Sequence, residues 1–263
     1  MSDKINISIL TNNDKIWNIL LWEKTINKLI NKYNIQKIYI VPDKISDKFK
    51  GIKVPLWYIN TFGIINFLLI GIFSINRILK TIIKTDGFSF ENISKKHNIE
   101  ILYVNSLKDN IVYQNLKKDK TNILLILTTH IINKKILNIK NLKIINQFCG
   151  DINKIQGIMP YFWSYMQKIK PSICFHIVNS KINSGNIVLK FKFNNKFNSM
   201  IDFTKKCFYI YPFVIDKVIL NTLNISESKK NNIIQNYCSY PTKKHYKKFK
   251  NLNGKIITLK DLF

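Results

Sequence analysis

Glycine and proline are scarce in this sequence of 263 residues. It has 8 glycines and 6 prolines, which excludes collagen-like chains and proline-rich low-complexity segments. Hydrophobic residues make up 46% of the chain, which is enough for a sizeable core and excludes a wholly disordered protein. The length fits one large domain, or one domain with an extension.

Acidic residues and arginine are also rare. Lys+Arg number 42 against 15 Asp+Glu, a net charge of +27, yet Arg77 is the only arginine. Such a charge ordinarily indicates a nucleic-acid or anionic-surface partner. Phosphate-binding proteins commonly use Arg beside Lys, because the guanidinium group binds phosphate in a bidentate way. Since the lysines are spread over the whole length, we interpret the charge as compositional drift, with RNA or an anionic membrane as weaker alternatives.

Closely spaced metal ligands are missing. The four cysteines are Cys149, Cys174, Cys207 and Cys238, and the four histidines are His97, His130, His176 and His245. No CxxC pair and no pair of histidines with metal-ligand spacing occurs, so we expect no metal site. Free thiols, and an N-terminus without the apolar centre of a signal peptide, predict a cytoplasmic protein.

Short apolar runs alternate with helical periodicities in the first 150 residues. The runs at 5–10, 38–41, 99–104, 123–127 and 142–146 predict strands, and the segments at 16–30, 110–116 and 133–137 predict helices. Strands that alternate with helices indicate right-handed crossovers. The sequence therefore predicts an α/β, doubly wound, mostly parallel sheet.

The most apolar segment of the chain lies at 57–79. Asn60 and Asn66 interrupt it, and its unbroken apolar part is shorter than the ~18 residues of a membrane span. We therefore expect a helix that packs on the sheet, or one that rests on a membrane surface. Further along, the pattern predicts a helix at 161–166, two strands at 173–178 and 187–193, and a helix at 202–223. We divide the chain into a domain at 1–225 and a basic extension at 226–263.

Two blocks in the second half of the chain carry distinctive residues. The first, at 144–163, reads IINQFCGDINKIQGIMPYFW, and the second consists of SICFHIV at 172–178 and INSGNIV at 182–188. Together they resemble the folate-dependent formyltransferase family. That family has a strand with Asn-x-His, a short helix with an aromatic-Trp step, a strand with Thr-x-His, and an Ile-Asp-x-Gly-x-Ile-Ile segment. The resemblance extends over nearly the whole chain and implies a Rossmann-like formyltransferase fold.

The resemblance implies formyl transfer from 10-formyltetrahydrofolate to an amine. Asn146 matches the family Asn, whose amide holds the formyl oxygen. The proton-transferring His is replaced by Phe148, and the Asp that assists it is replaced by Asn183, whereas Gly157 and Gly185 are kept. Phe148 cannot carry a proton, and Asn183 cannot act as a base, so the usual chemistry is lost or changed.

Nearby groups offer compensation. His176 matches the Thr-x-His position, and His130 follows a predicted strand, where open sheets bind ligands. Asp151 is a further candidate, with a turn or helix cap as its structural alternative. A satisfied interior histidine is the alternative for His176, and Cys149 and Cys174 are expected to be small core residues.

The sequence thus predicts Asn146, His176 and Asn183 at the reacting centre, and His130, Phe148 and Gly185 around the folate. The expected acceptor is a small-molecule amine, such as a nucleotide-linked amino sugar. The alternative is an inactive protein that keeps the fold for binding or assembly. Whether the chain forms a homo-oligomer stays open.

Overall fold

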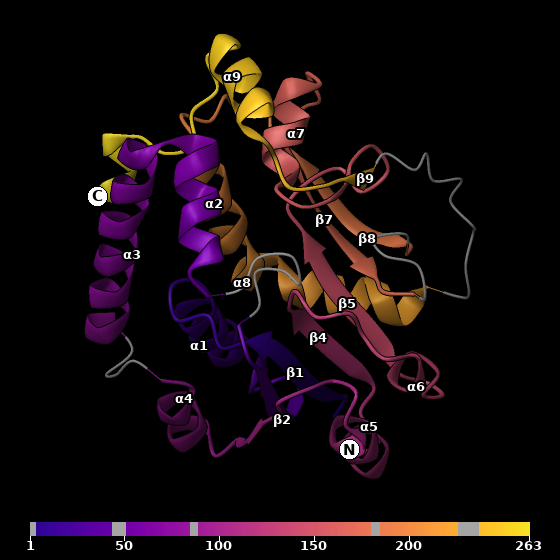
Figure 1. The fold of residues 1–263 in the computed structure, drawn as a ribbon. Coiled ribbons are helices and arrows are strands. Elements are labelled where there is room, and N and C mark those ends of the chain that lie inside the picture. Colours follow the sequence, from indigo (N-terminus) through magenta and orange to yellow (C-terminus); the bar gives the residue numbers. More distant parts are fainter. Residues whose placement is uncertain (1–3, 44–50, 85–88, 180–184, 226–236) are drawn as a thin grey trace.

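The computed structural model describes residues 4–43, 51–84, 89–179, 185–225 and 237–263, and these form a seven-stranded sheet with the order β3-β2-β1-β4-β5-β7-β8 (Figure 1). The strands are β1 (Asn6–Asn12), β2 (Asn34–Val41), β3 (Glu100–Tyr103), β4 (Ile123–Leu127), β5 (Lys143–Phe148), β7 (Ser172–Ile177) and β8 (Ile187–Lys192). The first five are parallel, whereas β7 is antiparallel to both β5 and β8. The predicted doubly wound, mostly parallel sheet is confirmed.

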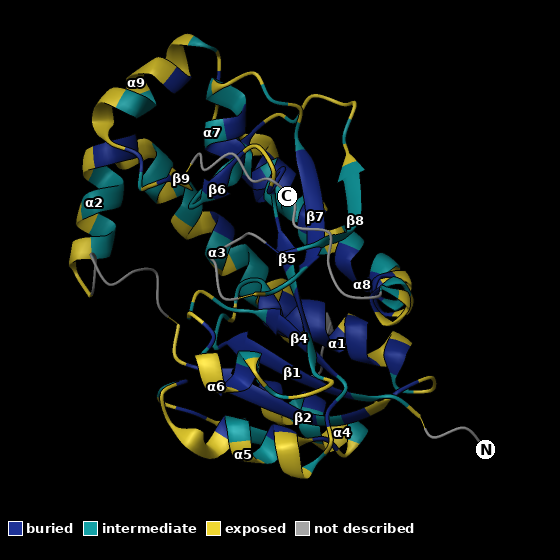
Figure 2. Ribbon diagram, turned by 90° about the vertical axis from the view of Figure 1, so that its right-hand side faces the viewer, coloured by how far each residue is buried: buried dark blue, intermediate teal, exposed yellow. Residues whose placement is uncertain are grey.

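Helices cover both faces of this sheet. On one face lie α1 (Asn18–Leu29), α4 (Phe90–His97) and α8 (Met200–Asn224), and on the other lie α5 (Asn110–Lys118) and α6 (Lys134–Leu137). Strand β4 shows why the sheet is central, because Leu125 packs into the first layer while Leu124 and Ile126 pack into the second. Figure 2 shows the resulting buried strands between partly exposed helices.

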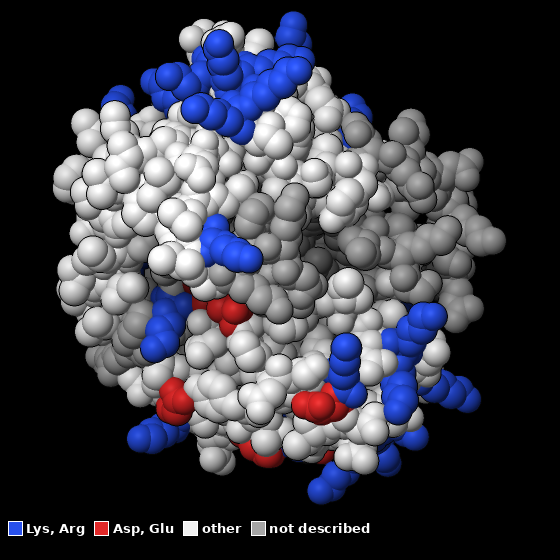
Figure 3. Space-filling view, viewed as in Figure 1, with Lys and Arg blue, Asp and Glu red and all other residues white. Residues whose placement is uncertain are grey.

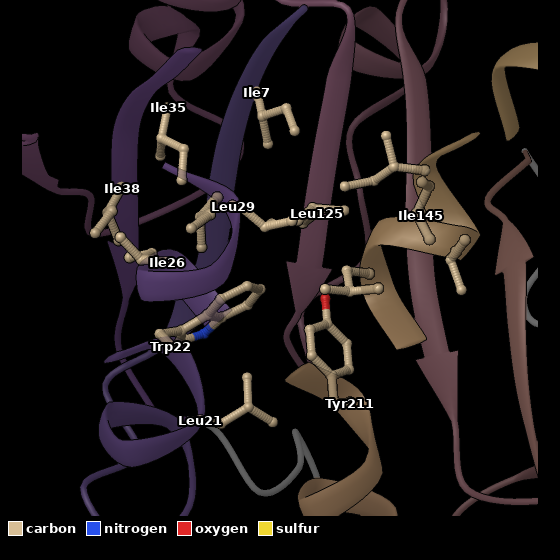
Figure 4. Packing of buried hydrophobic residues seen from close by; sticks show 14 of the residues in the cluster. Ile7, Leu21, Trp22, Ile26, Leu29, Ile35, Ile38, Leu125, Ile145 and Tyr211 are labelled. Carbon is tan, nitrogen blue, oxygen red and sulfur yellow. The ribbon is translucent and has the colours of Figure 1, made fainter. Parts of the chain in front are cut away.

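The larger core lies between the sheet and the α1–α8 pair. Trp22 and Tyr211 meet there edge to face, with ring centroids 5.6 Å apart, and Leu125 and Ile145 point into the same layer (Figure 4). Full burial of an aliphatic side chain such as these contributes about 1.5–3 kcal/mol. This layer therefore fixes the strands whose ends carry the candidate site.

The apolar segment forms two helices, α2 (Lys53–Phe62) and α3 (Ile64–Lys84). Gly63 separates them with a φ of 86°, a conformation that favours glycine. The expectation that this segment packs on the sheet is wrong, since α3 packs instead against α1, α2 and the 3₁₀ helix η1 (Leu259–Leu262). Among the described residues, Ile64–Ile83 is the one helix that is long and apolar enough, by length and composition alone, to cross a membrane.

The described part of the C-terminal segment packs on the domain. Strand β9 (Tyr237–Cys238) pairs with β6 (Gln156–Gly157), and α9 (Lys243–Asn251) lies on α7 (Pro160–Met166). Phe249 is fully buried and stacks on Phe162 at 4.5 Å between centroids. The lysines of α9 face outward and gather at one end of the molecule (Figure 3). The basic residues of α9 therefore lie on the outer side of a helix that Phe249 anchors to α7.

Candidate active site

Asn146 and His176 are cross-strand partners. Asn146 lies near the carboxyl end of β5 and is in register with His176 on β7. Because side chains alternate along a strand, Asn146 shares its face with Ile144, which packs on the α5–α6 side. Gln147 points to the other face, where its amide donates to the carbonyl of Cys207 at 3.0 Å. The structure therefore brings two of the sequence-predicted site residues together.

The His176 ring is almost completely buried. It is 2% exposed, and its Nδ1 lies 3.3 Å from the carbonyl oxygen of Ile177. A carbonyl only accepts hydrogen bonds, so Nδ1 carries the proton and Nε2 carries the lone pair. Nε2 is buried and has no hydrogen-bond partner among the described residues. Burial lowers the pKa of His176 to about 4, so the ring is neutral at physiological pH.

The Asn146 side chain is partly exposed and makes no hydrogen bond with any other described residue. A primary amide offers two N–H donors and one carbonyl acceptor. Cross-strand partners hold their Cβ atoms about 4.5–5.5 Å apart. The pair therefore presents an amide donor and an imidazole acceptor side by side, with no partner within the described chain for either.

Phe148 occupies a closed apolar position two residues further along β5. It is buried with Ile152 and Cys174, against which Ile187 also packs. A Cβ on Gly150 would come within 2.9 Å of the Phe148 ring, so the glycine leaves room for it. Burial raises the pKa of the Cys174 thiol to about 11, so this sulfur stays protonated. The position of the family histidine is thus an aromatic wall without a proton carrier.

Asp151 is committed to structural contacts. Its carboxylate accepts a charged hydrogen bond from Lys190 Nζ on β8 at 2.6 Å and accepts a second from the backbone N–H of Asn153 at 3.3 Å. The carboxylate is 5% exposed. An ion pair this well covered holds β8 to the loop after β5. The structure thus gives Asp151 a turn contact, as in the structural alternative, together with an ion pair.

Steric contacts require glycine at two motif positions, 157 and 185. A Cβ on Gly185 would lie 1.4 Å from the carbonyl oxygen of Ile177, and a Cβ on Gly157 would lie 2.2 Å from that of Cys238. Gly157 also has a φ of 102°. Gly185 therefore sits directly against the strand that carries His176. Asn183 lies outside the described residues.

His130 belongs to a separate polar group. Its Nε2 lies 2.9 Å from the carbonyl oxygen of Pro42, on the β2 side of the sheet edge. Next to it, Asn12 at the end of β1 bonds to Thr128, Thr129 and Asp43. This cluster is not among the residues predicted from the sequence, although polar residues that follow two buried parallel strands are a usable signal.

A hollow of about 350 Å³ lies elsewhere, between α1, α3 and α8. Trp17, Arg77 and Lys205 are among its lining residues. None of the predicted site residues lines it, so it is separate from the Asn146–His176 pair.

No family model and no curated protein matches this sequence. Solved structures with the same fold do exist. Glycinamide ribonucleotide transformylase 1 from Symbiobacterium toebii superposes with a TM-score of 0.59 at 9% identity, over 88% of this chain and 93% of that one. A 4-N formyltransferase from Francisella tularensis gives 0.53 at 17% identity, over 98% and 84%. A sugar 3N-formyl transferase, solved in the presence of dTDP and 5-N-formyl-THF, gives 0.51 at 15% identity, over 90% and 70%.

These comparisons establish the architecture. The chain has the formyltransferase fold that the motif resemblance implied.

Proposed function

We propose that this protein binds a formyl-folate donor and a small amine, and transfers the formyl group slowly through Asn146 and His176. The observation that carries the proposal is the cross-strand pair of the Asn146 amide and the buried His176 Nε2, neither of which has a hydrogen-bond partner among the described residues. The shared fold, and the folate and nucleotide present with one structural neighbour, support the substrate classes.

In the proposed reaction, the amine nitrogen attacks the formyl carbon of 10-formyltetrahydrofolate. A C–N bond forms between the amine and the formyl carbon, the C–N bond to N10 of the folate breaks, and the proton that the amine loses passes to that N10, so that tetrahydrofolate leaves. The Asn146 amide would donate to the formyl oxygen as negative charge develops there, an interaction of roughly 3 kcal/mol in comparable sites. Nε2 of His176 would accept the amine proton.

Burial makes His176 a weak base for this task. A ring whose pKa is about 4 takes a proton from an ammonium group only against a large free-energy difference. Loss of effective acid–base catalysis typically lowers a rate by about 10²–10⁴-fold. We therefore expect turnover well below that of an enzyme with a histidine in place of Phe148.

The remaining predicted residues would shape the binding site. Phe148 and Gly185 are buried beside the Asn146–His176 pair and would form the wall behind the folate, with His130 further along the sheet edge. Asn183, which lies outside the described residues, remains a prediction for the reacting centre. The proposed acceptor is a nucleotide-linked amino sugar, because dTDP accompanies one neighbour of this fold.

A second candidate function is binding without catalysis. It is favoured by Phe148, whose ring fills a closed apolar cluster at the position of the family histidine. Such a protein would still hold the folate.

Single-turnover transfer of a labelled formyl group to a dTDP-amino sugar tests the two functions. For the first, slow product formation should disappear in His176→Ala and persist in Asn153→Ala, an exposed asparagine of the same block. For the second, calorimetry should detect 5-formyltetrahydrofolate binding without any product. A protein that does neither refutes both proposals.

The double substitution Phe148→His with Asn183→Asp is the gain-of-function arm. It restores both family residues, and turnover should rise if donor and acceptor bind. Because Phe148 is buried, the free energy of unfolding of the double variant is measured in parallel. Phe148→Leu is the matched control for the altered packing.

A further inference from the structure

Helix α3 carries an exposed apolar stripe along its whole length. Six residues spaced alternately by three and four positions form this α3 seam, and each is between 42% and 71% exposed. They are Ile65, Leu68, Ile72, Ile75, Leu79 and Ile82. Monomeric soluble proteins rarely leave a continuous apolar strip of this kind uncovered.

The spacing of the seam indicates what covers it. A strict alternation of three and four residues has a period of 3.5, which keeps a stripe facing a second helix over several turns. A helix that lies on a membrane needs only a broad apolar face and commonly carries Lys and Arg on the remainder. The α3 seam therefore fits a helical partner better than a lipid surface.

The order of residue types along the seam reads the same from either end: Ile, Leu, Ile, Ile, Leu, Ile. Two copies of α3 that run antiparallel would match layer by layer. Ile65 would face Ile82, Leu68 would face Leu79, and Ile72 would face Ile75. A two-fold axis requires this kind of self-complementary surface.

The seam is the part of the surface where charge does not oppose a second copy. The chain has a net charge of +27, so two copies repel each other over most of their surfaces. The positions that flank the seam carry no charge; they are Ile64, Leu69, Gly71, Asn76, Ile78 and Ile83. Arg77 lies on the opposite side of the helix, where it stacks on Trp17. The seam and its flanks are thus a neutral strip.

The fold presents α3 as a rigid surface element. Its inner side is held by Phe73, which packs with Leu262, and by Asn76, which donates to the Leu262 carbonyl at 3.0 Å. Figure 1 shows the helix at the left-hand edge of the molecule, away from the sheet, and Figure 3 shows mostly uncharged atoms over it. A second copy could dock there without disturbing the Asn146–His176 pair.

We propose that the α3 seam is the interface of a homodimer, with two antiparallel helices that cross near Ile72 and Ile75. The contact is apolar and relieves no charge. Raising the ionic strength from about 0.05 to about 0.5 M should therefore strengthen it, because screening weakens the repulsion between the two basic copies.

Sedimentation equilibrium of the full chain tests the dimer. The wild-type chain should sediment at twice its 31.0 kDa. Ile75→Lys should raise the dimer dissociation constant by about 100-fold or more, because one ammonium group would enter each of the two central layers, opposite Ile72 of the other copy. Leu220→Lys, at a 49% exposed leucine of α8, is the matched control and should stay dimeric. A monomeric wild type, or equal effects of the two substitutions, would refute the proposal.

Charge pairing across one layer tests the antiparallel register. Leu68→Glu alone and Leu79→Lys alone should each weaken the dimer, and a mixture of the two should recover it as a heterodimer. The double variant should recover a homodimer, because each introduced carboxylate then faces an introduced ammonium group. If the double variant stays monomeric, the register is wrong. If the wild type is monomeric but binds phosphatidylserine vesicles through Ile75, the seam is a membrane surface and the dimer is refuted.

Discussion

Two asparagines at the carboxyl edge of the sheet lie in opposite situations. The Asn12 carbonyl accepts from Thr128 Oγ1 at 2.7 Å and from the Thr129 N–H at 3.4 Å, and its amide donates to Asp43 Oδ1 and Thr129 Oγ1, both at 3.1 Å. Asn146, on a strand two places along, makes no side-chain hydrogen bond to any other described residue.

The comparison separates a structural amide from an available one. An asparagine side chain forms at most four hydrogen bonds, so Asn12 is saturated. It ties the end of β1 to the segments that follow β2 and β4, and it has no bond left for a ligand. The donors and the acceptor of the Asn146 side chain are unused by other described residues, and so is the lone pair of the adjacent His176 Nε2. Of these two asparagines, Asn146, together with His176, is the one that can bind a polar ligand.

The largest expected effect is on transfer. Asn146→Ala should lower single-turnover formyl transfer by about 10²–10³-fold, roughly 3–4 kcal/mol in the barrier, because the developing oxyanion loses its donor. Asn146→Asp should be at least as slow, since a carboxylate repels that charge. Rapid-quench detection of the formylated product is the measurement. An unchanged rate in Asn146→Ala would show that the open amide has no part in the reaction.

The second effect is acid sensitivity that originates at His176. Its folded-state pKa of about 4 is below the unfolded value of about 6.5. The unfolded chain therefore takes up a proton first as pH falls, and stability is lost between about pH 6.5 and about pH 4. The loss from this ring should reach about 3 kcal/mol at pH 4.

Urea unfolding of the wild type and of His176→Gln, at about pH 7 and about pH 4.5, isolates that contribution. The difference in the free energy of unfolding between the wild type and His176→Gln should narrow as pH falls, because glutamine does not titrate. NMR of the ring carbons gives an independent readout. If the His176 resonance titrates near its ordinary pKa, the ring is not buried as described.

The sequence predicts the strands that are buried on both faces, because such strands consist almost wholly of apolar residues. Strand β4 is bounded as expected, because all five residues at 123–127 are apolar. Strand β2 begins earlier than expected, at Asn34. The first residues of β2 are mostly polar, so an apolar pattern does not detect them. Lys37 is stabilised there by an ion pair, 2.7 Å between its Nζ and the carboxylate of Asp119 at the end of α5.

The candidate site was predictable only in part, and for a similar reason. The motif resemblance pointed to Asn146 and His176, but their register depends on strand pairing across 30 residues. The sequence shows that Phe148 replaces a histidine, whereas only packing shows that the ring closes an apolar cluster. The exposure of α3 was unpredictable too, because apolar residues look alike whether the domain or a partner covers them.

The third effect is a loss of stability when Asn12 is replaced. Asn12→Ala should destabilise the fold by about 2 kcal/mol, because the Asp43 carboxylate and the Thr128 hydroxyl lose buried partners. Thermal or urea unfolding at neutral pH measures it. Asn13→Ala, at the adjacent half-buried position, is the control and should cost less. A loss below about 0.5 kcal/mol for Asn12→Ala would mean that water replaces the amide without penalty.

The smallest expected effect is on the stability of the fold when Asn146 is replaced. Asn146→Ala should change the free energy of unfolding by no more than about 0.5 kcal/mol, the range of a substitution that breaks no contact. The lost amide has no partner within the described residues, so its removal leaves no buried donor or acceptor unpaired. The same variant should lose transfer, so stability and function separate at this residue, as they do not at Asn12. A cost near 2 kcal/mol would instead assign Asn146 a structural bond, and it would remove the open amide on which the proposed chemistry depends.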